Sequence, residues 1–312
     1  MYKFSLGNFI SESNQLLENV EIAYHIFGEL APEKKVIWVC HALTANSDAQ
    51  DWWPNFIGEN LTLDTEKYTI VCANILGSCY GTSFQKQEKL PLITIRDMVK
   101  LHQELAKFLQ ISEIELLLGG SLGGMQCLEW AIAEPDFIKK LFVIATNAKH
   151  SAWGIAFNEA QRMALELGEN GIDAARAIAM LSYRNYDTFE ATQTDEEEKL
   201  ENYRAASYQR HQGEKLRKRF SKESYFMLSK AMDSHHLGRG RNSVENALSQ
   251  ITAETLVIGI DSDILFPVSE QKFIAEHIKN AKLEVICSLY GHDGFLIETE
   301  EISTLLKKHF NL

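Results

Sequence analysis

Short, continuous apolar runs recur along this chain and alternate with segments that have helical periodicity. The runs are rich in β-branched and aliphatic residues, which is typical of strands that are covered on both faces. Because such strands alternate with helices, the pattern predicts a mostly parallel, doubly wound α/β sheet. The predicted strands are 36–40, 68–74, 114–118, 140–145, 255–260 and 283–289, and the predicted helices are about 94–109, 123–134, 269–279 and 297–309.

The alternation stops between residues 149 and 244. This segment contains several charged stretches with helical period, and the next apolar strand comes only at residue 255. We therefore predict an α/β core formed by residues 1–148 and 245–312, interrupted by a helical insertion of residues 149–244. Within it, the acidic run TDEEEKLE (194–201) is interpreted as the start of a helix, with Thr194 as the N-cap.

Composition and charge narrow the class of protein. The chain has 312 residues, of which 45% are hydrophobic and 24% charged, as in ordinary globular proteins. The formal net charge of −12 argues against binding to nucleic acid or to an anionic membrane. No apolar run approaches the roughly 18 residues of a membrane span, and the N-terminal stretch lacks the pattern of a signal peptide.

The five cysteines are not paired at metal-ligand spacing, and three of them lie in predicted strands. That use of cysteine indicates a reducing compartment, so we predict a cytoplasmic protein. The adjacent His235 and His236 are the remaining candidates for a metal site. Because neighbouring positions on a helix diverge by about 100°, we predict that they bind no metal.

The most informative motif is GGSLG at residues 119–123, where a predicted strand runs into a predicted helix. Gly-x-Ser-x-Gly at such a junction is typical of a nucleophile elbow, which exposes the serine hydroxyl on a sharp turn. Side chains at Gly119 and Gly123 would collide with the neighbouring strand and helix. The motif predicts Ser121 as a nucleophile and the Leu122 N–H as one donor of an oxyanion hole.

An acid and a histidine follow the serine in the order expected for a Ser-Asp-His triad. Asp263 comes just after the strand 255–260, with Asp261 as a competitor nearer to the strand, and His292 lies in a loop after the last strand. In the predicted triad His292 removes the serine proton, and Asp263 orients the imidazole and stabilises its charged form.

The loop after the first predicted strand, HALT (41–44), should supply the second oxyanion donor. We assign the Leu43 N–H, with Ala42 as the alternative. His41 follows a strand and is interpreted as part of the loop structure rather than as a catalytic base.

Nearly the whole chain resembles the homoserine O-acetyltransferases, a family with the α/β-hydrolase fold. The segments with this resemblance include VCHALT (39–44), GGSLGGMQCLEWA (119–131), AARAIAMLSY (174–183), SYQRHQGEKLRKRF (207–220), SDILFP (262–267) and GHDGFLIE (291–298). The resemblance implies a hydrolase core with a helical lid, which fits the insertion at 149–244, and an enzyme that dimerises through that lid.

The resemblance also implies a reaction. In this family Ser121 would take an acetyl group from acetyl-CoA, and the hydroxyl of L-homoserine would then remove it, a step of methionine biosynthesis. The matching positions imply Arg176 as the partner of the substrate carboxylate with Tyr183 beside it, Asp293 for the ammonium, and Thr44 as an orienting residue. No bound cofactor is implied, because acetyl-CoA is a co-substrate. Arg176 and Tyr183 are seven positions apart, so one helix face can present both.

Three alternatives remain open on the sequence alone. The same scaffold would serve succinyl-CoA as donor, L-serine as acceptor, or an esterase in which water attacks the acyl-enzyme. Serine and homoserine differ by one methylene, which is worth only about 1–3 kcal/mol of discrimination.

Overall fold

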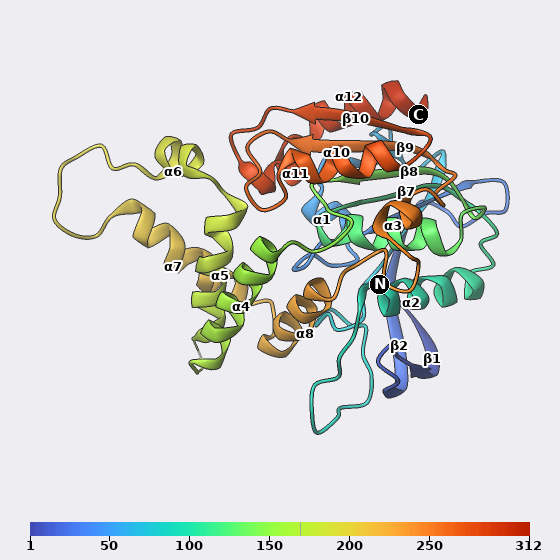
Figure 1. Ribbon diagram of the computed structural model, residues 1–312, viewed down its shortest axis with the longest axis horizontal. Coiled ribbons are helices and arrows are strands. Elements are labelled where there is room, and N and C mark those ends of the chain that lie inside the picture. Colours follow the sequence, from blue (N-terminus) through green and yellow to red (C-terminus); the bar gives the residue numbers. More distant parts are fainter. Residues whose placement is uncertain (169) are drawn as a thin grey trace.

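The computed structural model describes residues 1–168 and 170–312, and its centre is an eight-stranded sheet with the order β1-β2-β6-β3-β7-β8-β9-β10 (Figure 1). From β6 to β10 in this order the strands run parallel to one another, whereas β2 is antiparallel to both β1 and β6. Their bounds are β1 Tyr2–Ile10, β2 Leu16–Phe27, β3 Lys35–Cys40, β6 Tyr68–Ala73, β7 Ile114–Gly120, β8 Ile138–Ile144, β9 Glu254–Ile260 and β10 Ala281–Ile286. Two short strands, β4 (Ile57–Gly58) and β5 (Leu63–Asp64), pair separately.

The central strands are covered on both faces, as their continuous apolar runs predict. In β3, the side chains of Val36, Trp38 and Cys40 belong to one buried cluster, and those of Ile37 and Val39 belong to another on the opposite face. This alternation is the geometric consequence of the two-residue period of a strand. The predicted α/β fold with a mostly parallel sheet is confirmed.

Helices pack on both faces of this sheet (Figure 1). Apolar side chains of α2, α3, α9 and α10 share the cluster of Trp38, whereas those of α1 and α12 share the cluster of Ile37. A capping box between Thr94 and Asp97 begins α2. The bounds are α1 Ala49–Trp52, α2 Ile95–Phe108, α3 Leu122–Ala133, α9 Val244–Leu248, α10 Val268–His277, the 3-10 turn η1 Gly291–Asp293, α11 Gly294–Ile297 and α12 Thr299–Phe310.

Between β8 and β9 the chain forms a group of helices that projects away from the sheet, on the left in Figure 1. Within this group α4 packs against α5 and α8, and α5 packs against α7. The helices are α4 Ala152–Glu166, α5 Gly171–Tyr183, α6 Tyr186–Gln193, α7 Arg204–Arg217 and α8 Lys222–Asp233. They lie within the predicted helical insertion, whose boundaries at 149 and 244 stay a prediction.

The acidic run 194–201 does not start a helix, so that prediction is wrong. Thr194 is instead the C-terminal cap of α6, and its hydroxyl donates a hydrogen bond to the carbonyl of Glu190. The next helix, α7, begins only at Arg204, whose backbone N–H donates to the Asp195 carboxylate. One acidic residue of the run therefore does cap a helix, but it does so across a loop.

The first two strands, β1 and β2, were not predicted. β1 is an edge strand with mostly exposed side chains, of which only Phe9 is fully buried. A strand in that position needs no continuous apolar run, so its sequence lacks the signal that identifies the central strands. None of the helices in residues 1–168 and 170–312 combines the length and the hydropathy that a membrane span requires.

Candidate active site

Ser121 lies on the sharp turn between β7 and α3, with φ 56° and ψ −126°. Such a positive φ is strained for a residue with a side chain and is typical of functional turns. The two motif glycines are required by close approach. A Cβ on Gly119 would lie 2.6 Å from the backbone of Gly123, and one on Gly123 would lie 2.1 Å from the carbonyl oxygen of Cys40. The elbow therefore has the predicted geometry.

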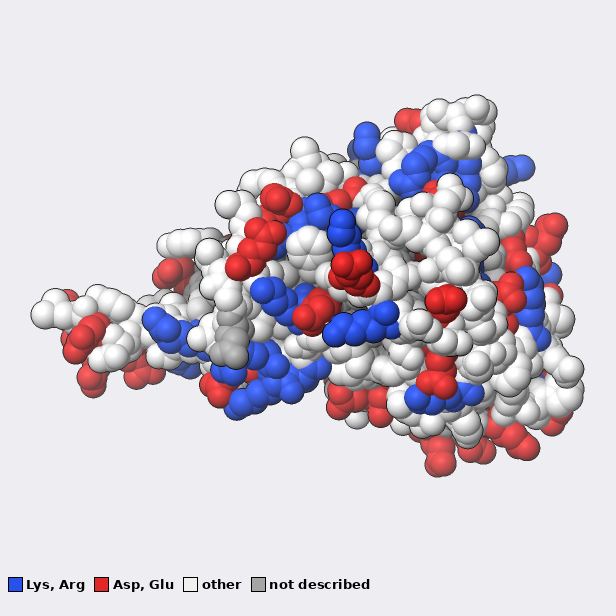
Figure 2. Space-filling view, turned by 90° about the horizontal axis from the view of Figure 1, so that it is seen from below, with Lys and Arg blue, Asp and Glu red and all other residues white. Residues whose placement is uncertain are grey.

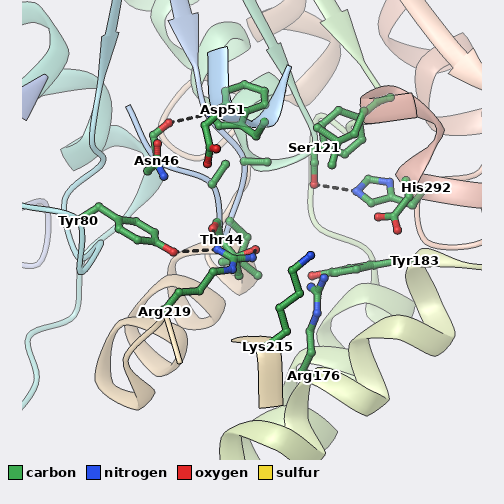
Figure 3. A pocket seen from close by; sticks show the side chains of 17 residues that line it. Thr44, Asn46, Asp51, Tyr80, Ser121, Arg176, Tyr183, Lys215, Arg219 and His292 are labelled. Atoms are coloured by element: carbon green, nitrogen blue, oxygen red, sulfur yellow. Dashed lines mark hydrogen bonds between the residues drawn. The ribbon is translucent and has the colours of Figure 1, made fainter. Parts of the chain in front are cut away.

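Ser121, His292 and Asp263 are joined by hydrogen bonds (Figure 3 shows the bond between Ser121 and His292). His292 Nδ1 lies 2.8 Å from Asp263 Oδ2, and Nε2 lies 2.9 Å from Ser121 Oγ. Because a carboxylate can only accept, Nδ1–H is the donor and Nε2 accepts the serine O–H. The three residues are only 6%, 3% and 3% exposed, respectively.

Backbone hydrogen bonds fix the acid of the triad. Oδ1 of Asp263 accepts the backbone N–H groups of Leu265 and Phe266 at 2.8 and 2.9 Å, so this carboxylate is locked in place. Asp261, the competing aspartate, is exposed and accepts instead from the Ser288 N–H at 3.2 Å. The structure therefore joins Asp263, and not Asp261, to His292.

Of the two predicted oxyanion donors, Leu43 lines the same cavity as Ser121, and Leu122 directly follows Ser121 in the chain. Leu122 is the first residue of α3, so its N–H belongs to the electropositive end of that helix. Leu43 and the alternative donor, Ala42, lie on the loop after β3 and line the cavity beside Ser121.

A chain of buried, neutral side chains supports this loop from behind. Gln126 Nε2 donates to the carbonyls of both His41 and Leu122 at 3.2 Å, and His102 Nε2 lies 2.8 Å from Gln126 Oε1. One amide thereby connects the backbone on both sides of the predicted oxyanion hole. Gln126 and His102 were not identified from the sequence, because their roles depend on burial beneath the loop.

His41 belongs to this support rather than to the reacting groups. Its Nδ1 lies 2.8 Å from the Ala42 carbonyl, and its Nε2 accepts the Ile75 N–H at 3.1 Å. Complete burial lowers the pKa of His41 to about 4, and burial likewise lowers the pKa of His102 to about 4. Both imidazoles are therefore neutral at pH 7.

Ser121 opens into a cavity of about 570 Å³ that is walled partly by the helical insertion. Arg176 and Tyr183 enter from α5, and the guanidinium lies 5.3 Å from the centre of the tyrosine ring (Figure 3). They share one face of the helix, as their spacing predicts. Burial raises the pKa of Tyr183, an effect that Arg176 partly offsets. The phenol is therefore neutral at physiological pH.

The other two predicted substrate-binding residues also line the cavity, and each is held by an arginine. Asp293 Oδ2 accepts from Arg184 Nε at 2.7 Å. The carbonyl of Thr44 accepts from Arg219 Nη1 at 2.6 Å, and the same nitrogen lies 2.8 Å from the hydroxyl of Tyr80.

Sequence reasoning missed Arg184, Tyr80, Lys215 and Arg219. The last three line the cavity, and Lys215 and Arg219 come from the basic stretch KLRKRF at 215–220. Its cluster of cations is a visible signal, but the sequence does not say which members face the cavity.

In the part of the chain that the structure describes, no three His, Cys, Asp or Glu side chains are grouped as metal ligands. His235 and His236 follow the end of α8 rather than lying on a helix, contrary to our interpretation. His235 Nε2 lies 3.0 Å from the carbonyl of Asn147, which gives this ring a structural partner.

Comparisons with known proteins agree with this geometry. Residues 35–299 match the family model of the α/β hydrolase fold. The homoserine O-acetyltransferase of Cyclobacterium marinum is 41% identical and covers 96% of this chain and 92% of its own, and that of Nostoc punctiforme is 39% identical, covering 96% and 93%. Among solved structures, the homoserine O-acetyltransferase of Staphylococcus aureus is 29% identical, with a TM-score of 0.87 over 100% of this chain and 95% of its own. The chain therefore belongs to the homoserine O-acetyltransferase family, within the α/β-hydrolase fold.

Proposed function

We propose that the protein is an acyltransferase that moves an acetyl group from acetyl-CoA to the hydroxyl of L-homoserine. The main support is the continuous chain of hydrogen bonds from Asp263 through His292 to Ser121, which lies at the bottom of the cavity. Relatives that are about 40% identical over nearly the whole chain are named homoserine O-acetyltransferase.

In the first half-reaction Ser121 Oγ attacks the thioester carbonyl while its proton passes to His292 Nε2. The carbonyl oxygen becomes an oxyanion, to which the N–H groups of Leu43 and Leu122 would donate. When this intermediate collapses, the C–S bond breaks and His292 returns the proton to the sulfur. CoA leaves as the free thiol, and the acetyl group remains on Ser121.

The second half-reaction runs through the same groups with a different nucleophile. His292 takes the proton of the homoserine hydroxyl, whose oxygen attacks the acetyl carbonyl. The ester bond to Ser121 then breaks, and His292 returns the proton to Oγ. The products are O-acetyl-L-homoserine and the free enzyme, which is a step of methionine biosynthesis.

The acceptor is an amino acid with one anionic and one cationic group. The planar Arg176 guanidinium suits the carboxylate, because it can donate two parallel hydrogen bonds. Asp293 suits the ammonium: one carboxylate oxygen is bonded to Arg184, and the other can accept from substrate. Tyr183 would pack beside Arg176, and Thr44 would help to orient the acceptor.

The experiment that tests this proposal separates the two half-reactions. Purified protein is mixed with acetyl-CoA with and without L-homoserine, and released thiol is followed over time. We expect a stoichiometric burst without acceptor and sustained turnover with homoserine. Continuous thiol release that does not depend on homoserine would indicate an esterase and would contradict transfer. The same assay with succinyl-CoA and with L-serine tests the two remaining alternatives.

Assembly and location complete the proposal. We infer a homodimer formed through the helical insertion, because large apolar side chains are exposed there: Met163 at 62%, Leu167 at 84% and Leu181 at 53%. Light scattering should give twice the chain mass, and a strict monomer would contradict the dimer. We further propose a cytoplasmic enzyme with no bound cofactor or metal and no nucleic-acid or membrane partner.

A further inference from the structure

Two cations stand at the rim of the cavity and have no role in the chemistry proposed above. Lys215 lies in the last turn of α7, and Arg219 follows two residues after that helix ends. Both side chains are exposed and both line the cavity. Figure 3 shows them entering from the insertion, on the side opposite Ser121 and His292.

Neighbouring cations of the same stretch have carboxylate partners, whereas Lys215 and Arg219 form no ion pair among the described residues. Arg217 pairs with Asp173 at 2.9 Å, and Lys218 pairs with Glu214 at 2.7 Å. Among the described residues, Arg219 donates only to neutral acceptors, which are the carbonyl and the hydroxyl of Thr44 and the hydroxyl of Tyr80.

No carboxylate oxygen of the described residues lies within 4.0 Å of a Lys215 or Arg219 nitrogen. The acidic side chains that share the cavity are Asp51 and Asp293, and the latter is already paired with Arg184. Two uncompensated cations at a hollow are an electrostatic site for an anion.

Exposure along the cavity shows where such an anion would lie. Ser121 and His292 form the floor at 6% and 3% exposure, and Arg176 and Tyr183 are half-buried in the wall. Lys215 and Arg219 are exposed, and so is Asp51, the third exposed residue of the lining. A ligand that spans floor and rim must therefore place its reacting group deep in the cavity and its anionic group near solvent.

Coenzyme A has this distribution of charge. Its thioester is at the end of a long, neutral pantetheine arm, and its diphosphate and 3′-phosphate lie at the other end. We propose that Lys215 and Arg219 bind the phosphate groups of the donor while its thioester reaches Ser121. This inference rests on the proposed function, since it assigns the donor half of that site.

The molecule as a whole would otherwise repel such a ligand. The formal net charge is −12, whereas Figure 2 shows basic side chains gathered on the helical projection near the body of the molecule. A local basic site in an acidic protein concentrates a polyanion at one place and orients it. Arg219 also holds Thr44 in the loop that contains Leu43, so donor binding and the oxyanion loop share a residue.

The test compares donors with and without phosphate. Lys215→Gln, Arg219→Gln and the double variant are assayed for thiol release from acetyl-CoA and from S-acetylpantetheine. The kcat/KM for acetyl-CoA divided by that for S-acetylpantetheine should fall about tenfold in each single variant, because a charge-assisted hydrogen bond to phosphate is lost. In the double variant this ratio should fall further. The matched control is Lys218→Gln, which removes an equal charge from the next turn and should leave the ratio unchanged.

The ratio separates phosphate binding from a general defect. If Arg219→Gln slows the reaction of both donors equally, Arg219 acts only through Thr44. If Lys215→Gln also leaves the ratio of the two kcat/KM values unchanged, the inference is overturned. Rising salt should also lower the wild-type ratio, since the rim is exposed.

A binding measurement keeps this inference distinct from the proposed function. Calorimetry on the Ser121→Ala protein compares CoA with pantetheine, and no chemistry is needed for it. If wild type releases no thiol from either donor, the proposed function fails. Even then, a phosphate site is supported if CoA binds more tightly than pantetheine and Lys215→Gln removes that difference. Equal binding of CoA and pantetheine would refute it.

Discussion

The floor of the cavity and the wall contributed by the helical insertion are built on different physical principles. At the floor, Ser121, Asp263 and His292 are buried, hydrogen-bonded to one another and fixed at the ends of the sheet. At the wall, Arg176 and Lys215 are partly or fully exposed and come from helices that project from the sheet.

This difference separates reaction chemistry from selection of the substrate. The floor needs no substrate to assemble: backbone N–H groups hold Asp263, and the rings of Phe266 and Phe295 flank His292 with centroids at 5.2 and 5.3 Å. A preorganised site of this kind would acylate many esters or thioesters. In the function proposed above, the charges on the wall would bind the acceptor and the donor, so the insertion should determine which molecules react.

The largest effect is expected at the floor. Ser121→Ala removes the nucleophile on which both half-reactions depend, so turnover should fall about 10⁶-fold. Thiol release without acceptor measures the first half-reaction, and exchange of label between acetyl-CoA and CoA confirms its loss. Ser303→Ala is the matched control, because the Ser303 hydroxyl donates to the Thr299 carbonyl within α12 and does not line the cavity. Appreciable transfer by Ser121→Ala would show that the acetyl group does not pass through Ser121.

The next effect distinguishes the two aspartates. Asp263→Asn leaves the shape of the floor unchanged but presents an amide to His292 Nδ1, which favours the wrong tautomer and should lower kcat about 10⁴-fold. Asp261→Asn should keep kcat within a few-fold of wild type, because Asp261 bonds to the Ser288 backbone instead. Steady-state kinetics of the two variants give the kcat values to compare. A larger loss at Asp261 would contradict the geometry of the floor.

The same contrast explains how much of the molecule the sequence could predict. Central strands such as β3 and β7 are buried on both faces, so their composition alone identifies them within about two residues. β1 is an exposed edge strand, and no compositional rule distinguishes it from a loop. The acidic run 194–201 illustrates the converse: its local propensity favours a helix, yet Asp195 folds back across a loop to cap α7.

The floor was predictable because it depends on order along the chain. Ser121, Asp263 and His292 each follow a strand of one parallel sheet, so topology alone brings them to one edge. The rim was not predictable in this way. Whether Arg219 or Arg217 faces the cavity depends on how α7 packs against α5, which is a tertiary property that its sequence does not encode locally.

A smaller, selective effect is expected at the wall. Arg176→Leu removes the cation proposed for the acceptor carboxylate, so kcat/KM for homoserine should fall about 10- to 100-fold. The burst of thiol release without acceptor should remain, because the donor does not use that carboxylate site. Arg210→Leu, an exposed position on α7, is the matched control. If the burst also disappears, Arg176 supports the floor, and the separation between floor and wall is wrong.

The smallest effect concerns the pH dependence of stability beneath the floor. Burial lowers the pKa of His102 to about 4, whereas in the unfolded chain it returns to about 6.5. Between these values the unfolded state binds the extra proton, so this contribution to stability is complete above pH 6.5 and is lost as pH falls toward 4. His102→Gln should therefore reduce the slope of unfolding free energy against pH by up to about 1.4 kcal/mol per pH unit.

Denaturant unfolding at several pH values between 7 and 5 measures that slope. His211→Gln, at an exposed position of α7, should leave it unchanged. Equal slopes in wild type and His102→Gln would mean that His102 binds its proton equally well in the folded and unfolded states, which would contradict a pKa lowered by burial.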